Sequence, residues 1–256
     1  MTEIVIIGSG TCVPSLRRGG PSTCLLTDGI TILVDSASGT LRQLVKAGIP
    51  YESLDYLLYT HVHPDHVGEF IPYVFATKYA PGFNRTTPVT VLAAKGFKAF
   101  YQHLKDAYGH WAEADPGMLN IEEIPVEMQT ALQLPPLIVR TTPTRHTPMS
   151  LAYRIECPDG KAVVFSGDTE FSPELIELAK DADLMVCECA APEGHRIPGH
   201  LIPSEAGKIA KEAGVKRLIL THFYPNCDQH DLLTPCKKEY SGPVVLAEDL
   251  MRIILV

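Results

Sequence analysis

The chain has 256 residues, 45% of them hydrophobic, and a formal net charge of −8 at pH 7. This length allows one large core, so we expect residues 1–256 to form a single domain. No apolar run is long enough to cross a bilayer, and residues 1–7 lack the basic and small-residue pattern of a secretory signal. The acidic balance argues against nucleic-acid binding through a broad cationic surface, although a local basic groove remains compatible with it.

The seven cysteines favour a reduced, cytoplasmic protein, because their number is odd and no C-x-x-C pair occurs. Cys187 and Cys189 flank Glu188 in a predicted strand, so both thiols would point to one face. A metal site and core packing both fit this alternation. We favour core packing, because free cysteine is commonly buried.

Apolar runs in the first sixty residues predict a series of strands. They cover residues 3–7, a hairpin of residues 23–27 and 31–34 around Asp28-Gly29, and residues 56–59. Asp35 follows the second hairpin strand and has two equally good interpretations. It either caps a helix predicted at residues 39–47 or supports a metal site.

Three histidines and an aspartate follow the strand at residues 56–59 within six positions, namely His61, His63, Asp65 and His66. Alternate residues of an extended segment share a face, so His61 and His63 can reach one ion. A turn after them would direct Asp65 and His66 to a second ion. Imidazole suits zinc, iron and manganese, whereas carboxylate favours harder ions, so the cluster predicts two neighbouring metals.

The remaining sequence alternates predicted helices and strands. Helices are expected at residues 67–79, at 95–108, after Ser172, and up to Ala213. Strands are expected at residues 87–93, 121–126, 137–141, 151–155, 162–166, 184–189, 217–220, 243–246 and 251–256. Residues 109–117 are expected to form a loop, and His103 and His110 to lie on the surface.

Three further candidates stand where predicted strands end. His146 lies in a polar turn between two strands, where a histidine without a metal would be ordinary. Asp168 follows a strand and the turn Ser166-Gly167, so it is either a ligand or a simple turn cap. His222 follows a threonine at a strand end, which repeats the local context of His61.

The motif H-x-H-x-D-H at residues 61–66, followed by His146, Asp168 and His222, resembles the metallo-β-lactamase-fold hydrolases. This resemblance implies an α/β fold, a four-layer αββα sandwich of two mixed sheets packed face to face with helices outside. It also implies a dinuclear site. In the resemblance, His61, His63 and His146 bind the first metal, Asp65, His66 and His222 bind the second, and Asp168 bridges both.

Within that superfamily the chain most resembles the ribonuclease Z branch and its small phosphodiesterase relatives, in the segments 7–14, 167–169 and 221–223. In ribonuclease Z, the positions of Glu188 and His200 are implicated in proton donation to the leaving oxygen. The chain departs from that branch because residues 147–167 leave no room for the arm that grips tRNA. Residues 36–40 also lack the usual acidic residue, and Glu188 is followed by Cys189-Ala190-Ala191.

The resemblance implies a hydrolase in which a hydroxide bridging two ions attacks phosphorus in line. Zinc suits five imidazoles and two carboxylates best, with manganese and iron as alternatives. We expect Asp65, His200 and Glu188 to act in catalysis, with His200 protonating the leaving oxygen. The expected substrate is a small-molecule phosphodiester or an RNA, and by analogy with the branch the expected assembly is a homodimer.

Three other functions fit parts of the same pattern. A thioester or lactone hydrolase of the glyoxalase II kind would use the same ligands on a carbonyl substrate. A flavodiiron oxidoreductase is disfavoured, because that branch has Glu at the position of His63 and needs a flavin domain. A non-catalytic metal-binding sensor on this fold would be expected to have lost ligands, whereas this chain has all of them.

Overall fold

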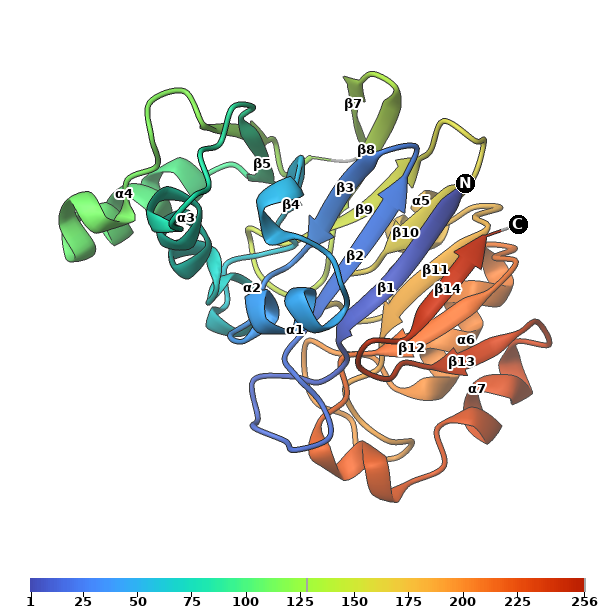
Figure 1. Cartoon of the computed structure of the whole chain (residues 1–256). Helices are drawn as coiled ribbons and strands as arrows, with labels where there is room; N and C mark the ends of the chain where they lie inside the picture. Colours follow the sequence, from blue (N-terminus) through green and yellow to red (C-terminus); the bar gives the residue numbers. More distant parts are fainter. Residues whose placement is uncertain (128, 256) are drawn as a thin grey trace.

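Two seven-stranded sheets pack face to face in the computed structural model, which describes residues 1–127 and 129–255 (Figure 1). The first sheet has the order β14 (Arg252–Leu255), β1 (Thr2–Gly8), β2 (Ser22–Thr27), β3 (Ile30–Val34), β4 (Tyr56–Leu58), β5 (Val89–Ala94) and β6 (Leu119–Ile124). The second has the order β13 (Val244–Leu246), β12 (Leu218–Thr221), β11 (Leu184–Glu188), β10 (Ala162–Phe165), β9 (Leu151–Glu156), β8 (Leu137–Pro143) and β7 (Thr130–Leu134).

Both sheets are mixed, as predicted. In the first, β14, β1, β2 and β3 pair antiparallel, and β3, β4, β5 and β6 pair parallel. In the second, β7 to β10 pair antiparallel and β10 to β13 parallel. The carboxyl ends of the parallel strands in each sheet therefore meet at one edge of that sheet.

Alternate side chains of β1 pack into two different cores, one on each face of the first sheet. Ile4 and Ile6 belong to the core between the sheets, while Val5 and Ile7 belong to a second core on the helical side. All four side chains are fully buried. Successive strand residues point to opposite faces, so a strand covered on both sides is apolar throughout rather than alternating.

Helices cover the outer faces of both sheets (Figure 1). Those on the side of the first sheet are α1 (Thr40–Lys46), α2 (Pro64–Val67), α3 (Phe70–Tyr79) and α4 (Phe97–Tyr108), with the 3₁₀ turns η1 (Tyr51–Ser53) and η2 (Gly109–Ala112). The later ones are α5 (Pro173–Leu178), α6 (Pro203–Glu212), η3 (Pro225–Gln229) and α7 (Leu233–Glu239). None of the helices in the described part of the chain has the length and apolar character needed to span a membrane. The predicted four-layer arrangement is confirmed.

The helix predicted at residues 67–79 is divided in two. The backbone N–H of Glu69 donates to the carbonyl of Ser36 (2.8 Å) instead of continuing α2. Gly68 is needed at this break, because a Cβ there would lie 2.6 Å from the carbonyl oxygen of Pro64. The strand predicted at residues 251–256 is β14, and its last predicted residue, Val256, lies outside the described residues.

The core between the sheets provides a direct test of the packing. Ile4→Ala is expected to lower the free energy of unfolding by about 2–5 kcal/mol, because it leaves a cavity in a fully buried position. Ile254 lies on the neighbouring strand β14 but is 49% exposed, so Ile254→Ala should change it by less than about 0.5 kcal/mol. Urea unfolding of both variants measures the difference. Equal losses would contradict the assigned faces of β1 and β14.

Candidate metal centre

The predicted ligands lie at the end of the sandwich where several strands finish. His61 follows β4, His146 follows β8, Asp168 follows β10 and His222 follows β12. Asp65 and His66 lie on the short helix α2, which begins at Pro64 directly after the extended His63. Proline is well suited to the first position of a helix, so it ends the extended segment here and turns the next two side chains inward.

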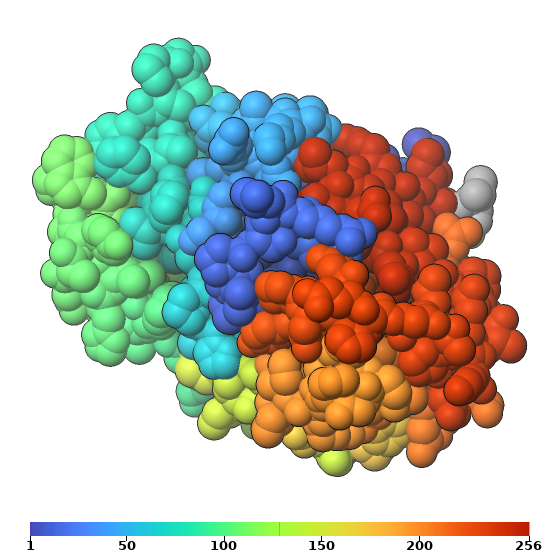
Figure 2. Space-filling view, turned by 90° about the horizontal axis from the view of Figure 1, so that it is seen from below, coloured from blue at the N-terminus to red at the C-terminus, as the bar shows by residue number. Residues whose placement is uncertain are grey.

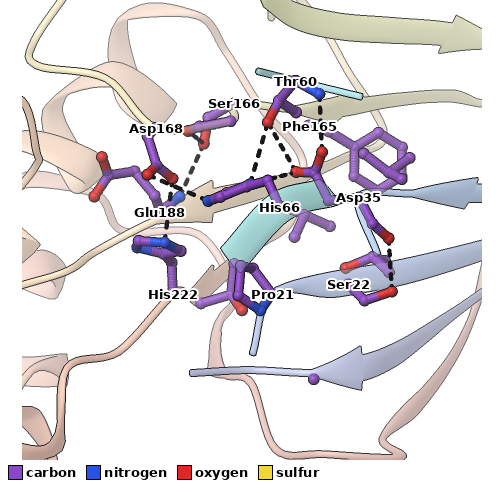
Figure 3. A pocket seen from close by; sticks show the side chains of 16 residues that line it. Pro21, Ser22, Asp35, Thr60, His66, Phe165, Ser166, Asp168, Glu188 and His222 are labelled. Carbon is purple, nitrogen blue, oxygen red and sulfur yellow. Dashed lines mark hydrogen bonds and ion pairs between the residues drawn. The ribbon is translucent and has the colours of Figure 1, made fainter. Parts of the chain in front are cut away.

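Asp168 lies among the histidines, and Figure 3 shows it next to His66 and His222. Its Oδ2 atom is 3.8 Å from Nε2 of His61, 3.4 Å from Nε2 of His66 and 3.7 Å from Nε2 of His146. Its Oδ1 atom faces the other way, 3.3 Å from Nε2 of His222. This one carboxylate therefore lies beside imidazoles of both predicted ligand groups.

The structure brings all the predicted ligands together in two sets with metal-binding spacing. In each set, one ligand atom per residue lies within 4.8 Å of every other. The first set is His61, His63, His146 and Asp168, and the second is Asp65, His66 and His222. The first set has the membership that the resemblance implies, whereas the second lacks Asp168, which also forms a third set with His200 and His222.

Several polar atoms that point into the centre are buried without a hydrogen-bond partner among the described residues. They are Nε2 of His61, Nε2 of His66, Oδ1 of Asp168 and Nε2 of His222. Leaving such an atom unsatisfied costs about 1–3 kcal/mol, so their convergence calls for a common partner. Imidazole nitrogens and carboxylate oxygens together fit a divalent metal ion.

Asp35 supports His66 from behind and does not cap α1, which begins after Gly39. The Nδ1–H of His66 donates to Oδ2 of Asp35 (2.8 Å), and the backbone N–H and hydroxyl of Thr60 donate to the same carboxylate (2.8 Å each). This bond fixes the ring so that Nε2 faces the centre, as is usual for a metal-binding histidine. His146 is held similarly, because its Nδ1–H donates to the carbonyl of Gly199 (3.1 Å).

Two residues of the site have a left-handed backbone that only glycine adopts without cost. These are Asp35, with φ of 57°, and His222, with φ of 61°. Such conformations cost on the order of 1–3 kcal/mol and persist where the surrounding structure holds them. Both lie directly after a strand, where the turn of the backbone directs the side chain of His222 at the centre and that of Asp35 at His66.

The charges of the site follow from burial and proximity. Burial and the neighbouring His66 lower the pKa of His61, so its imidazole is neutral, which is the form that binds metal. Burial opposes the charged form of His66, but the carboxylates of Asp168 and Asp35 outweigh it and raise the pKa. Burial likewise opposes charge on Asp168, yet His222 and His66 hold its pKa well below the usual range.

Replacing Asp35 should weaken metal binding without removing a ligand. Asp35→Asn is expected to lower metal affinity by about 10–100-fold, because His66 loses the acceptor that orients it. Competition with a chelating dye measures the affinity. Asp55→Asn is the matched control, since that carboxylate accepts a strand N–H from Thr31 (2.8 Å) at the other end of β4. An unchanged affinity in Asp35→Asn would contradict this support.

His200 and Glu188 form a buried pair beside the predicted ligands. The Nδ1–H of His200 donates to Oε1 of Glu188 (2.9 Å), and the His200 ring stacks 5.5 Å from that of His222. Burial opposes the charged form of His200, but the hydrogen bond to Glu188 outweighs it and raises the pKa of this imidazole. Nδ1 is engaged in this way, so Nε2 is the atom that His200 can offer to a substrate.

Glu188 lies behind His200 and has no free oxygen for a substrate. Oε1 also accepts the backbone N–H of Thr169 (2.8 Å), and Oε2 accepts those of Ala190 and Leu201 (3.2 Å each). The residue is 2% exposed. Glu188 therefore contacts the site through His200 and not through a free oxygen of its own.

The segment at residues 9–20 borders the site, and sequence reasoning did not assign it a role. In the view of Figure 2 it lies between the helices of the first sheet and the C-terminal half of the chain. Its Arg18 is buried and donates to Asp228, to Ser9 and to the carbonyl of Ala247. Together with Pro64 and Asp65, the segment lines a cavity of about 380 Å³.

Tyr224 also reaches the site and was not among the predicted residues. Its ring centroid lies 6.3 Å from that of His200 and 6.5 Å from that of His222. Its hydroxyl is 3.8 Å from the thiol of Cys12 in the segment at residues 9–20. The only sign of this role in the sequence is that Tyr224 stands two positions after the predicted ligand His222. Aromatic residues at such positions ordinarily pack in the core, so the sequence did not single it out.

The chain belongs to the family described as "Beta-lactamase superfamily domain", whose model matches residues 30–223. Ribonuclease Z of Mycobacterium marinum is 29% identical, with 99% of this chain and 98% of that protein covered. Ribonuclease Z of Mycobacterium bovis is 28% identical, with 99% and 98% covered.

Solved structures share the fold over nearly the whole chain. The metallo-β-lactamase-fold protein YhfI from Bacillus subtilis has a TM-score of 0.83 at 23% identity, covering 98% of both chains. The short form of human tRNase Z has a TM-score of 0.80 at 21% identity, covering 99% of both. The predicted fold, and the resemblance to ribonuclease Z within the metal-dependent hydrolases of this fold, are confirmed.

Proposed function

We propose that this protein is a dinuclear metal-dependent phosphodiesterase. The observation that carries the proposal is the position of Asp168, whose carboxylate lies 3.7–3.8 Å from His61 and His146 of the first set and 3.3–3.4 Å from His66 and His222 of the second. The family, and relatives named ribonuclease Z that match 99% of the chain, support phosphodiester chemistry. All the ligands are present, which argues against a sensor that has lost its metals.

The residues that would hold the ions are those of the two sets. His61, His63 and His146 serve the first, Asp65, His66 and His222 serve the second, and Asp168 serves both. Zinc fits this donor set best, with manganese and iron as alternatives. When bound, the ions supply a water nucleophile that is reactive at neutral pH and neutralise charge on the phosphate oxygens.

The chain's own residues orient the substrate and move the proton. Nε2 of His200 donates a proton to the leaving oxygen, while Glu188 holds the ring by its Nδ1–H. Asp65 is partly exposed at the mouth, with Oδ2 at 3.9 Å from Nε2 of both His66 and His222. Its carboxylate is therefore also placed to accept a hydrogen bond from the attacking water.

The surroundings favour a small phosphodiester over an RNA. Residues 147–167 form only β9, β10 and the short segments before, between and after them, where an RNA-gripping arm would have to begin. The arginines around the mouth are paired with carboxylates: Arg17 and Arg18 with Asp228, Arg145 with Glu174, and Arg196 with Glu205. RNA binding depends on cations that are free to contact phosphates.

A comparison of substrates tests the proposal. Metal-loaded protein is expected to hydrolyse bis-p-nitrophenyl phosphate and small phosphodiesters such as cyclic nucleotides, and to leave a tRNA precursor uncleaved. Chelation should abolish the hydrolysis and added metal restore it. Hydrolysis of only a thioester or a lactone would replace this proposal by an activity of the glyoxalase II kind. Efficient cleavage of the tRNA precursor would overturn the preference for a small substrate.

Three further assignments accompany the proposed function. We infer that residues 1–256 act as a single domain and that two copies associate as a homodimer, by analogy with the ribonuclease Z branch. A cytoplasmic location is supported by cysteines that are all free, six of them buried, including Cys187 and Cys189 in the core. Light scattering coupled to size exclusion tests the dimer, and one chain per particle would refute it.

A further inference from the structure

A second pair of histidines lies outside the centre. His195 and His230 are both exposed, and their ring centroids are 5.0 Å apart with an interplanar angle of 59°. The spacing is close to that between predicted ligands of one ion, where the centroids of His61 and His63 are 4.5 Å apart and those of His63 and His146 are 4.9 Å apart. The two rings are therefore near enough to share one ion.

The hydrogen bonds of this pair fix which nitrogen is free. The Nδ1–H of His195 donates to the carbonyl of Glu193 (3.1 Å), and the Nδ1–H of His230 donates to the carbonyl of Asn226 (2.9 Å). A carbonyl oxygen only accepts, so Nδ1 carries the proton in both rings. Nε2 is therefore the nitrogen of each ring that is left to bind a metal cation.

We propose that His195 and His230 bind a divalent transition-metal ion at a peripheral site, distinct from the candidate dinuclear centre. Copper, nickel and zinc are the ions that suit two imidazoles, and water would complete the coordination. The adjacent carboxylates have other partners: Glu193 accepts the N–H and hydroxyl of Ser204, and Asp231 accepts the N–H groups of Leu233 and Thr234. The site is thus a two-imidazole site, open to solvent.

An ion at this position would join two loops that border the centre. His195 belongs to the connection between β11 and α6, which also carries His200, and His230 follows Tyr224 in the connection after β12. The loops already touch at their bases, where the backbone N–H of Tyr224 and the thiol of Cys227 both donate to the carbonyl of Ala190 (3.3 and 3.2 Å). Metal binding would hold the outer parts of the loops together as well.

Copper binding to the zinc-loaded, full-length protein tests the site. One equivalent of Cu²⁺ is expected to give an electron paramagnetic resonance spectrum with nitrogen couplings from two imidazoles, without release of zinc. His195→Ala and His230→Ala should each abolish that spectrum and weaken copper binding by more than about tenfold. Loss of a group that only hydrogen-bonds to a metal ligand already lowers metal affinity by about tenfold, and these variants remove a ligand itself. His103→Ala, an exposed histidine on α4, should behave as wild type.

Two results would overturn the site. The first is an unchanged spectrum and affinity in both His195→Ala and His230→Ala. The second is release of zinc on copper addition, which would place the copper in the dinuclear centre. Neither result depends on whether the centre hydrolyses phosphodiesters, because the measurements follow bound metal and not turnover.

Discussion

Asp168→Asn is expected to abolish nearly all hydrolysis and to reduce the metal content of the purified protein. The substitution keeps the size of the side chain but removes the negative charge shared by two sets of imidazoles, at 3.3–3.8 Å from four ring nitrogens. We expect kcat/KM to fall by about 10³-fold, the upper end of the range for loss of one preorganised electrostatic group. Metal analysis and phosphodiester hydrolysis on the same preparation measure both effects.

Asp183→Asn is the matched control for this substitution. Asp183 precedes β11, at the end of the strand away from the centre, and its carboxylate pairs with Lys216 (2.9 Å). That variant should retain full metal content and activity. A metal content in Asp168→Asn equal to that of the control would show that Asp168 is not shared between ions.

His200→Ala is expected to discriminate between leaving groups. Hydrolysis of diesters with a strongly basic alkoxide leaving group should slow by about 10²–10⁴-fold, because proton donation to that oxygen is lost. Esters of p-nitrophenol release p-nitrophenolate, a weakly basic anion that needs no proton to leave, so their kcat should change little. Steady-state rates across a series of leaving groups measure the dependence. Equal losses for all of them would assign His200 to binding or structure instead.

Glu188→Gln separates positioning from direct catalysis. Glutamine keeps one acceptor oxygen for the Nδ1–H of His200 (now 2.9 Å from Glu188) but removes the negative charge. Its NH2 group must also face backbone N–H groups that now donate to the carboxylate, so the ring is held less firmly. The variant should show the same dependence on the leaving group as His200→Ala, with a lower kcat and an unchanged KM. Combining both substitutions should add little further loss. A fully additive double variant would contradict action through His200.

The sequence predicts one part of the centre from local spacing and the rest only through resemblance. His61, His63, Asp65 and His66 are close in the chain, so an extended segment followed by a turn is enough to bring them together. His146 and His222 look like ordinary histidines in loops. Their convergence depends on the strand order of the second sheet, which pairs residues far apart in sequence and has no local signal.

Asp35 illustrates what local reasoning cannot decide. A carboxylate after a strand and before a helix fits a cap as well as it fits a metal-site partner. The hydrogen bond between Asp35 and His66 decides between these two roles. Asp35 lies between β3 and β4 and His66 between β4 and β5, so the two residues meet only in the folded chain. The break between α2 and α3 is similar, because it depends on a hydrogen bond from Glu69 to the distant Ser36.

Metal titration into metal-free protein tests the two-ion centre most directly. The His195→Ala variant is the suitable background, because it removes the proposed peripheral site from the count. We expect two tightly bound equivalents per chain, by competition with a chelating dye, and bis-p-nitrophenyl phosphate hydrolysis that rises over the same titration. Full hydrolysis by metal-free protein, or saturation of both binding and activity at one equivalent, would contradict a dinuclear centre bridged by Asp168.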